Sequence, residues 1–427
     1  MVIFRKIVIR FLDAALLASA IAAPARAVDL LRWTAGPVLP NPGINRAAVA
    51  VGSTVYVMGG WYQSQNQDDL WALYPGAAGW TVRASLPTPM PPTAAVVDGK
   101  IYAIGYSEGS YGVVYRYDPA IDTWTARAHQ NYDALDSAAA AVGGKIYVMG
   151  GQYSNGGPSS TLAVYDPLAD TWAYRANMPT PRLALTAVEA GGLIYAIGGT
   201  GDDSTSTQSL SVVEAYDPAT NTWATKASMP RGKKHAAGTL MNGIIYMFGG
   251  SWPDGDAAVV EAYDPATDSW NTALVGPRNG SRATPAAASV DGKLYYIGGH
   301  AISSDSPAGA DSTLVDVGAF IPIVGYPKAG EFRIHNNIIR VKRGDEALIF
   351  LKDTPGASYE LRVFTRGGKI PVFKTQGITG ADGVAVVRFS GQMVLNGTGE
   401  PLGTGMYWVV ISGGKVKGRK PIVVVNE

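Results

Sequence analysis

The chain has 427 residues, of which 47% are hydrophobic and 16% charged, so it is long and apolar enough to build large cores. Its net charge is only +1, and Lys and Arg form no concentrated run, which argues against a nucleic-acid-binding protein. Cysteine is absent, which excludes disulfide bonds and thiolate metal sites.

Residues 1–27 have the features of a signal peptide. Arg5, Lys6 and Arg10 precede a short apolar segment at 14–23, and the small residues of "ARA" (25–27) precede a cleavage site. This segment is shorter than the roughly 20 residues of a transmembrane helix, and no later segment is long enough either. We therefore expect an exported protein, periplasmic or extracellular and at the cell surface, with no transmembrane span in the mature chain.

A repeat follows in residues 28–320. The first glycine of a Gly-Gly pair, or its equivalent, recurs every 45 to 51 residues, at Gly59, Gly105, Gly150, Gly198, Gly249 and Gly298. Each unit contains a small-residue strand, a strand that ends in glycines, a strand that ends in "YDP" and a strand with Trp. A period near 50 residues made of short strands is typical of a β-propeller, so we expect an all-β fold with six blades.

The segment "YDPATNTW" (216–223) recurs with small changes at 117–124, 165–172 and 263–270. Asp-Pro favours a tight turn, and Tyr and Trp are large enough to fill the space between blades, which widens outward. The glycines allow a turn near the crowded axis. We therefore assign this segment, and the acids Glu214 and Glu261 just before it, a structural role.

The two ends of the repeat complement one another. No "YDP" and no Trp follow Gly299, whereas Trp33 precedes the first Gly-Gly pair. We expect the strand around Trp33 to complete the last blade and close the ring, because closure removes free sheet edges.

The units resemble Kelch repeats, most clearly from "IYVMGG" through "YDPLADTW" to "MPTPR" (146–182). The resemblance implies a Kelch β-propeller like the central domain of galactose oxidase. It does not decide between an enzyme and a binding module, because such propellers host both.

A second domain is expected after a Pro- and Gly-containing linker at 321–330. Residues 331–427 contain about seven apolar strands, a pattern typical of a β-sandwich. The segment from "YELRVFTRGGKIPVF" to "MYWVVISGGK" resembles the Ig-like domain of bacterial flagellar hook-capping proteins. This resemblance implies an accessory role, such as attachment to the cell surface.

Ligand-binding residues are expected in the loops at one end of the propeller, because these loops do not repeat. Thirteen residues before the Tyr of each glycine-ending strand, blades 4 to 6 have a cation, and Gly43, Pro89 and Ala134 take this place in blades 1 to 3. In Kelch propellers that bind acidic peptides, basic residues at this position help to form the pocket. The alternative is that the cations pair with the loop carboxylates Asp202, Asp203, Asp254 and Asp256.

Aromatic residues and histidines add to the same end of the propeller, where they suit sugar rings as well as peptides. The predicted ligand-binding residues are Arg46, Trp61, Tyr106, Tyr153, Arg182, Lys233, His235, Trp252, Arg282 and His300. We predict no catalytic residue, no metal site and no cofactor. Copper-radical galactose oxidases share this layout but require a Cys cross-linked to a Tyr, and this chain has no Cys.

The sequence therefore favours a non-catalytic recognition module that binds a carbohydrate, an acidic sugar or an acidic peptide. Two alternatives stay open. One is a sugar-processing enzyme, since the six-bladed periplasmic sialic-acid mutarotases share the blade number and the predicted compartment. The other is a structural surface protein attached through the second domain.

Overall fold

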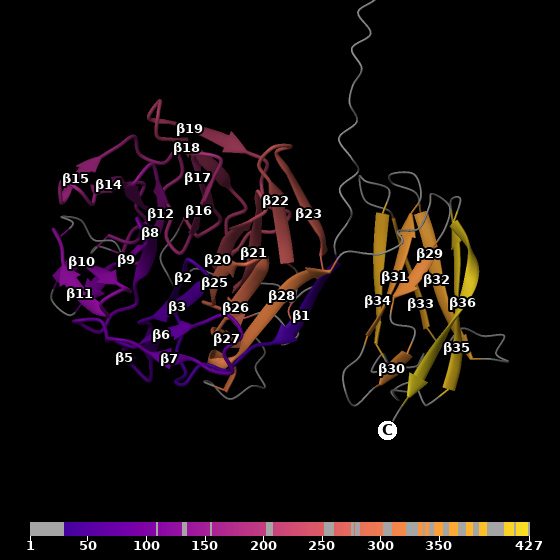
Figure 1. Cartoon of the computed structure of the whole chain (residues 1–427). Coiled ribbons are helices and arrows are strands. Elements are labelled where there is room, and N and C mark those ends of the chain that lie inside the picture. Colours follow the sequence, from indigo (N-terminus) through magenta and orange to yellow (C-terminus); the bar gives the residue numbers. More distant parts are fainter. Residues whose placement is uncertain are drawn as a thin grey trace, which may run out of the picture.

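Six antiparallel four-stranded sheets surround a common axis in the computed structural model (Figure 1). The structure describes residues 30–107, 110–129, 135–153, 156–201, 208–251, 260–274, 277, 282–301 and 310–321, and the strands β29–β36 of the C-terminal part. The innermost strands of neighbouring sheets contact each other all the way round, from β2 through β8, β12, β16, β20 and β25 back to β2. The prediction of a six-bladed β-propeller is confirmed.

The blades follow the chain, each running from its innermost strand outward. Blade 1 is built from β2 (Ala47–Val51), β3 (Thr54–Met58), β6 (Leu70–Leu73) and β7 (Thr81–Val82). Blade 2 is built from β8 (Thr93–Val97), β9 (Lys100–Ser107), β10 (Ser110–Asp118) and β11 (Thr123–Ala126). Blade 3 is built from β12 (Ala138–Val142), β13 (Lys145–Met149), β14 (Leu162–Asp166) and β15 (Thr171–Tyr174).

Blades 4 to 6 repeat this order, except that the outermost strand of blade 6 comes from the N-terminal side. Blade 4 is built from β16 (Thr186–Ala190), β17 (Leu193–Ile197), β18 (Val213–Asp217) and β19 (Thr222–Lys226). Blade 5 is built from β20 (Lys234–Met241), β21 (Ile244–Ser251), β22 (Val260–Asp264) and β23 (Ser269–Leu274). Blade 6 is built from β25 (Ala286–Val290), β26 (Lys293–Ile297), β28 (Val315–Ile321) and β1 (Leu30–Ala35).

Short elements lie in the loops between these strands. They are β4 (Trp61–Tyr62), β5 (Gln65–Asn66), β24 (Arg282–Ala283), β27 (His300–Ala301) and the 3-10 helix η1 (Ala310–Thr313).

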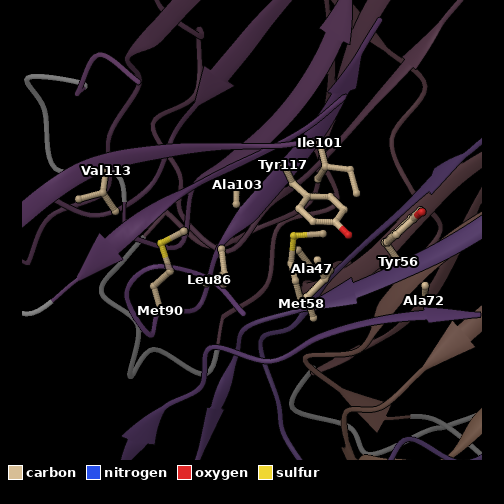
Figure 2. Packing of buried hydrophobic residues seen from close by; sticks show 11 residues of the cluster. Ala47, Tyr56, Met58, Ala72, Leu86, Met90, Ile101, Ala103, Val113 and Tyr117 are labelled. Atoms are coloured by element: carbon tan, nitrogen blue, oxygen red, sulfur yellow. The ribbon is translucent and has the colours of Figure 1, made fainter. Parts of the chain in front are cut away.

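Apolar side chains from neighbouring blades interleave to form the cores. Figure 2 shows this packing between blades 1 and 2, where Met58 and Tyr56 of blade 1 lie beside Tyr117 and Ile101 of blade 2. Tyr117 is fully buried, and its ring lies 5.0 Å from that of Trp124. The prediction that the recurring Tyr and Trp pack between blades is confirmed.

A polar clamp accompanies each of these Tyr–Trp pairs. In blade 2, Asp122 accepts a hydrogen bond of 2.6 Å from the Tyr117 hydroxyl and one of 2.9 Å from the backbone N–H of Ala84 in the preceding blade. Trp124 Nε1 donates to the Ala84 carbonyl at 2.7 Å. The equivalent acceptors in blades 3 to 5 are Asp170, Asn221 and Asp268.

The Gly-Gly pairs lie where the next blade leaves no room for a side chain. A Cβ built on Gly150 would lie 2.5 Å from the carbonyl oxygen of Arg182 in the next blade, and the Gly151 N–H donates to that same oxygen. Gly150 also has a φ of 64°, in the region that favours glycine. The pair is therefore required by the close approach of the next blade as well as by the turn.

The strand β1 pairs antiparallel with β28, from Leu30 opposite Ile321 to Ala35 opposite Asp316. Trp33 is buried and meets Phe248 of blade 5 edge to face, with ring centroids 5.7 Å apart. Trp80 Nε1 of blade 1 donates to the Pro37 carbonyl at 2.9 Å, as Trp124 does to Ala84. The N-terminal segment thus makes the contacts that an outer strand makes in the other blades.

The C-terminal strands form two separate sheets. A three-stranded sheet has the order β29–β31–β34, and a five-stranded sheet has the order β30–β36–β35–β32–β33. Their strands are β29 (Phe332–His335), β30 (Ile338–Arg340), β31 (Glu346–Lys352), β32 (Ser358–Thr365), β33 (Phe373–Ile378), β34 (Val384–Ser390), β35 (Gly405–Gly413) and β36 (Val416–Val425). Within the described parts of the chain, no helix is long and apolar enough to cross a membrane.

Candidate functional site

A cavity of about 210 Å³ lies among the innermost strands of the propeller. Its walls are mostly small side chains of these strands, such as Ala48, Ala94, Ala139, Ala187 and Ala287. Small residues are needed here because six strands converge on the axis. The polar and aromatic lining comes mainly from the segments that lead into the strands, so chemical specificity belongs to the mouth of this cavity.

One residue at an equivalent position lies at the start of each innermost strand or just before it, and all of these residues except Thr284 line the cavity. In five blades this residue has left-handed backbone angles, with φ between 52° and 55°. We call these five residues the mouth ring: Asn45, Asp136, Ala184, His235 and Thr284. Such angles are uncommon for residues other than glycine, and for a β-branched residue such as Thr284 they are strained.

The residues after the Gly-Gly pairs form an outer tier beside the mouth ring. Trp61 forms a bridge with Ile44, and Gln152 forms one with Leu135. His300 is paired with Ala283. Because Ile44, Leu135 and Ala283 each directly precede a mouth-ring residue, Trp61, Tyr153 and His300 lie next to the mouth.

Three predicted ligand-binding residues line the cavity itself: Arg46, Tyr106 and His235. Trp61 and Tyr153 do not line it, but they are 41% and 37% exposed beside it and can meet a bound molecule. Trp252 lies outside the described residues, as do Asp202, Asp203, Asp254 and Asp256.

The two predicted arginines of blades 4 and 6 are fully buried instead of facing a ligand. Arg182 forms an ion pair with Glu214 at 2.8 Å, and Arg282 forms one with Asp316 at 2.9 Å. Each guanidinium also donates to two backbone carbonyls of its own blade, those of Ala196 and Val212 for Arg182. Burial lowers the pKa of Arg182 to about 10, so the group stays charged at neutral pH, and Glu214 counteracts the shift.

Lys233 and Arg46 are buried in the same way. Lys233 pairs with Glu261 at 3.2 Å, and burial lowers its pKa. Arg46 lies three residues after Gly43 in the sequence. A Cβ built on Gly43 would lie 2.6 Å from the Arg46 guanidinium. The side chain of Arg46 therefore occupies the space that the missing side chain of Gly43 leaves.

The environment of Arg46 differs from that of the other three cations. Its guanidinium lies 4.5 Å above the ring of Trp71, which takes the strand position that Glu214 has in blade 4. Asp69 lies 3.6 Å away, and the carbonyl of Gly59 accepts a hydrogen bond of 2.6 Å. Burial lowers the pKa of Arg46 to about 10.

These placements correct the prediction of a basic half-rim. Each of these four cations, Arg182, Lys233, Arg282 and Arg46, has an acid within 4 Å inside its blade, because an unpaired charge at these depths would be too costly. The acids paired with Arg182, Lys233 and Arg282 come from the third strand of the blade, whereas the loop carboxylates of the alternative lie outside the described residues. In blade 2, Met90 and not Pro89 takes the structural place of Arg182, since Gly60 N–H donates to its carbonyl.

The histidines at the mouth are close to an acid and to each other. His235 Nε2 lies 3.9 Å from an oxygen of Asp136, across the small side chain of Ala184. Burial and, to a smaller extent, the electrostatic interaction with His235 lower the pKa of His300. Among the described residues, no group of three His, Cys, Asp or Glu side chains is placed to hold a metal ion.

Sequence reasoning missed Asn45 and Asp136. A signal was available, because both lie two residues before the first strand of their unit, as do Pro91, Ala184 and Thr284. Asn and Asp are the residue types that adopt left-handed angles most readily after glycine. Ala184 and Thr284 do not have this tendency, which obscures the pattern.

Comparisons with known proteins agree with this architecture. Residues 136–319 match the KLHDC2/KLHL20/DRC7 Kelch-repeats domain. Human Kelch-like protein 35 is 41% identical over 225 residues, which cover 51% of this chain and 36% of that protein. The chain thus spans about a third of the length of this relative.

A solved structure of YjhT has the same fold. Its TM-score is 0.55 at 18% sequence identity, and the match covers 68% of this chain and 97% of that one. At this identity the likeness bears on the fold alone. The matches thus support a Kelch-repeat domain over residues 136–319, within the six-bladed β-propeller that the structure shows.

Proposed function

We propose that this protein is an exported recognition module that binds a segment of another protein at the mouth of its propeller. Kelch domains are generally protein-interaction modules, which favours a protein ligand. The observation that carries the proposal is the cavity of about 210 Å³, which has small apolar walls and a mouth with polar and aromatic groups. A rigid pocket of this kind suits a few anchoring side chains of a partner.

The aromatic side of the mouth supports the same conclusion. Tyr106 lines the cavity, and Trp61 and Tyr153 are exposed beside it, on blades 1 to 3. Exposed Trp and Tyr supply large contact areas with little loss of conformational entropy, which makes them frequent anchors of protein interfaces.

Binding of a random peptide library to the whole chain tests this proposal. We expect a variant with Trp61→Ala and Tyr106→Ala to bind the selected peptides at least about tenfold more weakly. The matched control is a variant with Leu168→Ala and Tyr174→Ala, two residues of the outer edge that are 93% and 58% exposed. Weaker binding by the control with unchanged binding by the mouth variant would contradict the proposal.

A carbohydrate is the second candidate ligand. The exposed faces of Trp61 and Tyr153 are suited to stacking against sugar rings. A glycan array with the wild-type chain and Trp61→Ala tests this candidate, and a neutral glycan that loses binding in the variant would support it. An acidic ligand has less support, because both basic side chains that line the cavity lie near an acid, Arg46 near Asp69 and His235 near Asp136.

The remaining segments have proposed roles as well. Residues 1–27 direct export, and the pairing of β1 with β28 closes the ring. Residues 331–427 form an Ig-like β-sandwich that attaches the protein to a surface. Edman sequencing of the mature chain from the producing cell tests the first point, and a start before residue 28 would contradict it.

A further inference from the structure

The mouth ring is held together by its own backbone. Asn45 N–H donates to the Thr284 carbonyl, Thr284 N–H to His235, His235 N–H to Ala184, and Ala184 N–H to Asp136, over 2.9 to 3.4 Å. Each bond joins two neighbouring blades. The left-handed angles are needed because they turn each N–H toward the preceding blade and each carbonyl toward the following one.

The ring is interrupted at blade 2. Pro91 takes the mouth-ring position there, two residues before β8, and proline has no N–H to donate. Within the part of the chain that the structure describes, the Asn45 carbonyl accepts no hydrogen bond and the Asp136 N–H donates none. One backbone acceptor and one backbone donor thus flank Pro91, at a partly exposed position beside the cavity.

A carboxylate lies at the same interruption. The side chain of Asp136 is 24% exposed, and its nearest ionic contact among the described residues is His235 Nε2 at 3.9 Å, beyond hydrogen-bond distance. Arg46 lines the cavity too, but its guanidinium donates to the carbonyls of Gly59 and Pro42 and lies near Asp69. The acid at this place therefore has unused hydrogen-bonding capacity, whereas both terminal nitrogens of the neighbouring guanidinium already donate to backbone carbonyls.

We propose that the interruption at Pro91 is a subsite for an extended protein segment with a Lys or Arg side chain, whose cationic group is held by Asp136. The main chain of the segment donates to the Asn45 carbonyl and accepts from the Asp136 N–H, and so completes the ring. This inference rests on the proposed function and adds the chemical class of the ligand, which is opposite in charge to the acidic ligand that the sequence suggested.

Two further features favour a cationic segment. Tyr106 lies near the end of β9 in blade 2 and lines the same cavity as Pro91, where an aromatic face can contact a cation. Residues 28–326 contain 16 Lys and Arg against 25 Asp and Glu, a net charge of −9, which attracts basic segments over longer distances.

The test uses four synthetic peptide libraries that differ only in one fixed central residue, Lys, Arg, Gln or Glu. We expect the wild-type chain to bind the Lys and Arg libraries at least about tenfold more tightly than the Gln and Glu libraries. Asp136→Asn keeps the shape and removes the charge, so it is expected to abolish this preference. The edge variant with Leu168→Ala and Tyr174→Ala is the control and is expected to keep it.

The variant Pro91→Asn tests the backbone part of the inference. It supplies an N–H at a residue type that accepts left-handed angles, so the ring can close on itself. We expect binding of all four libraries to weaken about tenfold while the preference for Lys and Arg is retained. Unchanged binding by Pro91→Asn would overturn the completion of the ring by the ligand.

The outcomes separate this inference from the proposed function. A preference for the Glu library, or a Lys preference that Asp136→Asn does not change, overturns the cationic ligand. If binding is still lost in the variant with Trp61→Ala and Tyr106→Ala, the mouth remains the binding site. Absence of binding by all four libraries contradicts both.

Discussion

Asp122 and its equivalents hold neighbouring blades together through a single side chain. Its carboxylate accepts from the Tyr117 hydroxyl and from the Ala84 N–H, and its φ of 54° places it in a left-handed turn. We predict that Asp122→Ala lowers the free energy of unfolding by about 1 to 3 kcal/mol, because two donors lose their acceptor.

Asp122→Asn is the matched control, because Asn221 performs the same function in blade 4. We expect it to lose less than half as much stability in urea unfolding. An Asp122→Ala protein as stable as the wild type would show that the clamp is unimportant.

The same carboxylates predict how stability depends on pH. Hydrogen bonds lower the pKa values of Asp122, Asp170 and Asp268; the Ala84 N–H contributes most for Asp122, and the tyrosine hydroxyl contributes most for the other two. Groups with a lowered pKa in the folded state stabilise it above the unfolded value of about 3.9, and this contribution is lost as the pH falls further.

We therefore expect the free energy of unfolding to decrease on acidification below about pH 4. In a variant with Asn at all three positions the decrease in the free energy of unfolding should be smaller, because Asn has no carboxyl group to protonate. Asn is suited to this position, since Asn221 accepts the same hydrogen bond in blade 4. Urea unfolding at several pH values between 2 and 6 measures both slopes. Identical slopes in the two proteins would contradict this assignment.

Within one blade, the buried ion pair couples the innermost segment to the third strand. Arg182 and Glu214 are both buried, and they meet at 2.8 Å. We predict that Arg182→Met destabilises the protein by about 3 to 5 kcal/mol, because it leaves the Glu214 carboxylate buried without its cationic partner and with only the Thr180 hydroxyl as a donor among the described residues.

The double variant Arg182→Met/Glu214→Met removes both charges, and we expect it to regain most of this loss. Thermal unfolding of the two variants measures the difference. A stable Arg182→Met protein with altered ligand binding would instead assign Arg182 to the ligand site, as the sequence first suggested.

Whether the sequence predicts a contact depends on how far apart the two interacting residues lie along the chain. The glycine period and the "YDP" and Trp positions predict the blades, because they describe contacts within one unit or between adjacent hairpins. The position of Arg182 in the repeat correctly predicts which end of the blade has the cation. It does not predict that the cation is buried, because the partner Glu214 lies 32 residues away along the chain. That partner could have been found: in blades 4 and 5 an acid lies two residues before the recurring Tyr, and both of these blades have the cation.

The mouth ring was the hardest part to predict. His235 was selected for its chemistry, whereas Asn45 and Asp136 belong to the site through backbone angles that a sequence does not display. The interruption at Pro91 can be recognised only by comparison with hydrogen bonds between residues about 50 positions apart along the chain, such as the bond from the Thr284 N–H to the His235 carbonyl.

At the scale of the whole molecule, we propose that the closed ring depends on β1, the strand from the N-terminal side that pairs with β28. Trp33 is 5% exposed and packs on Phe248. We predict that Trp33→Ala lowers the free energy of unfolding by about 3 to 5 kcal/mol, the usual range for removing a buried aromatic side chain. Tyr74→Ala is a suitable control, since Tyr74 is 38% exposed, and it is expected to change stability much less. Equal stability of the Trp33→Ala and Tyr74→Ala proteins would contradict a role for this strand in holding the ring closed.

The central claim is that the mouth of the propeller, and not its outer edge, is the binding surface. Hydrogen–deuterium exchange of the whole chain, with and without the tightest peptide from the Lys library, tests it most directly. The account predicts slower exchange in the segments around Asn45 and Asp136, including the Asp136 N–H that has no acceptor within the described structure. Slower exchange confined to the outer hairpins, such as β10–β11 or β14–β15, with an unchanged mouth would contradict it.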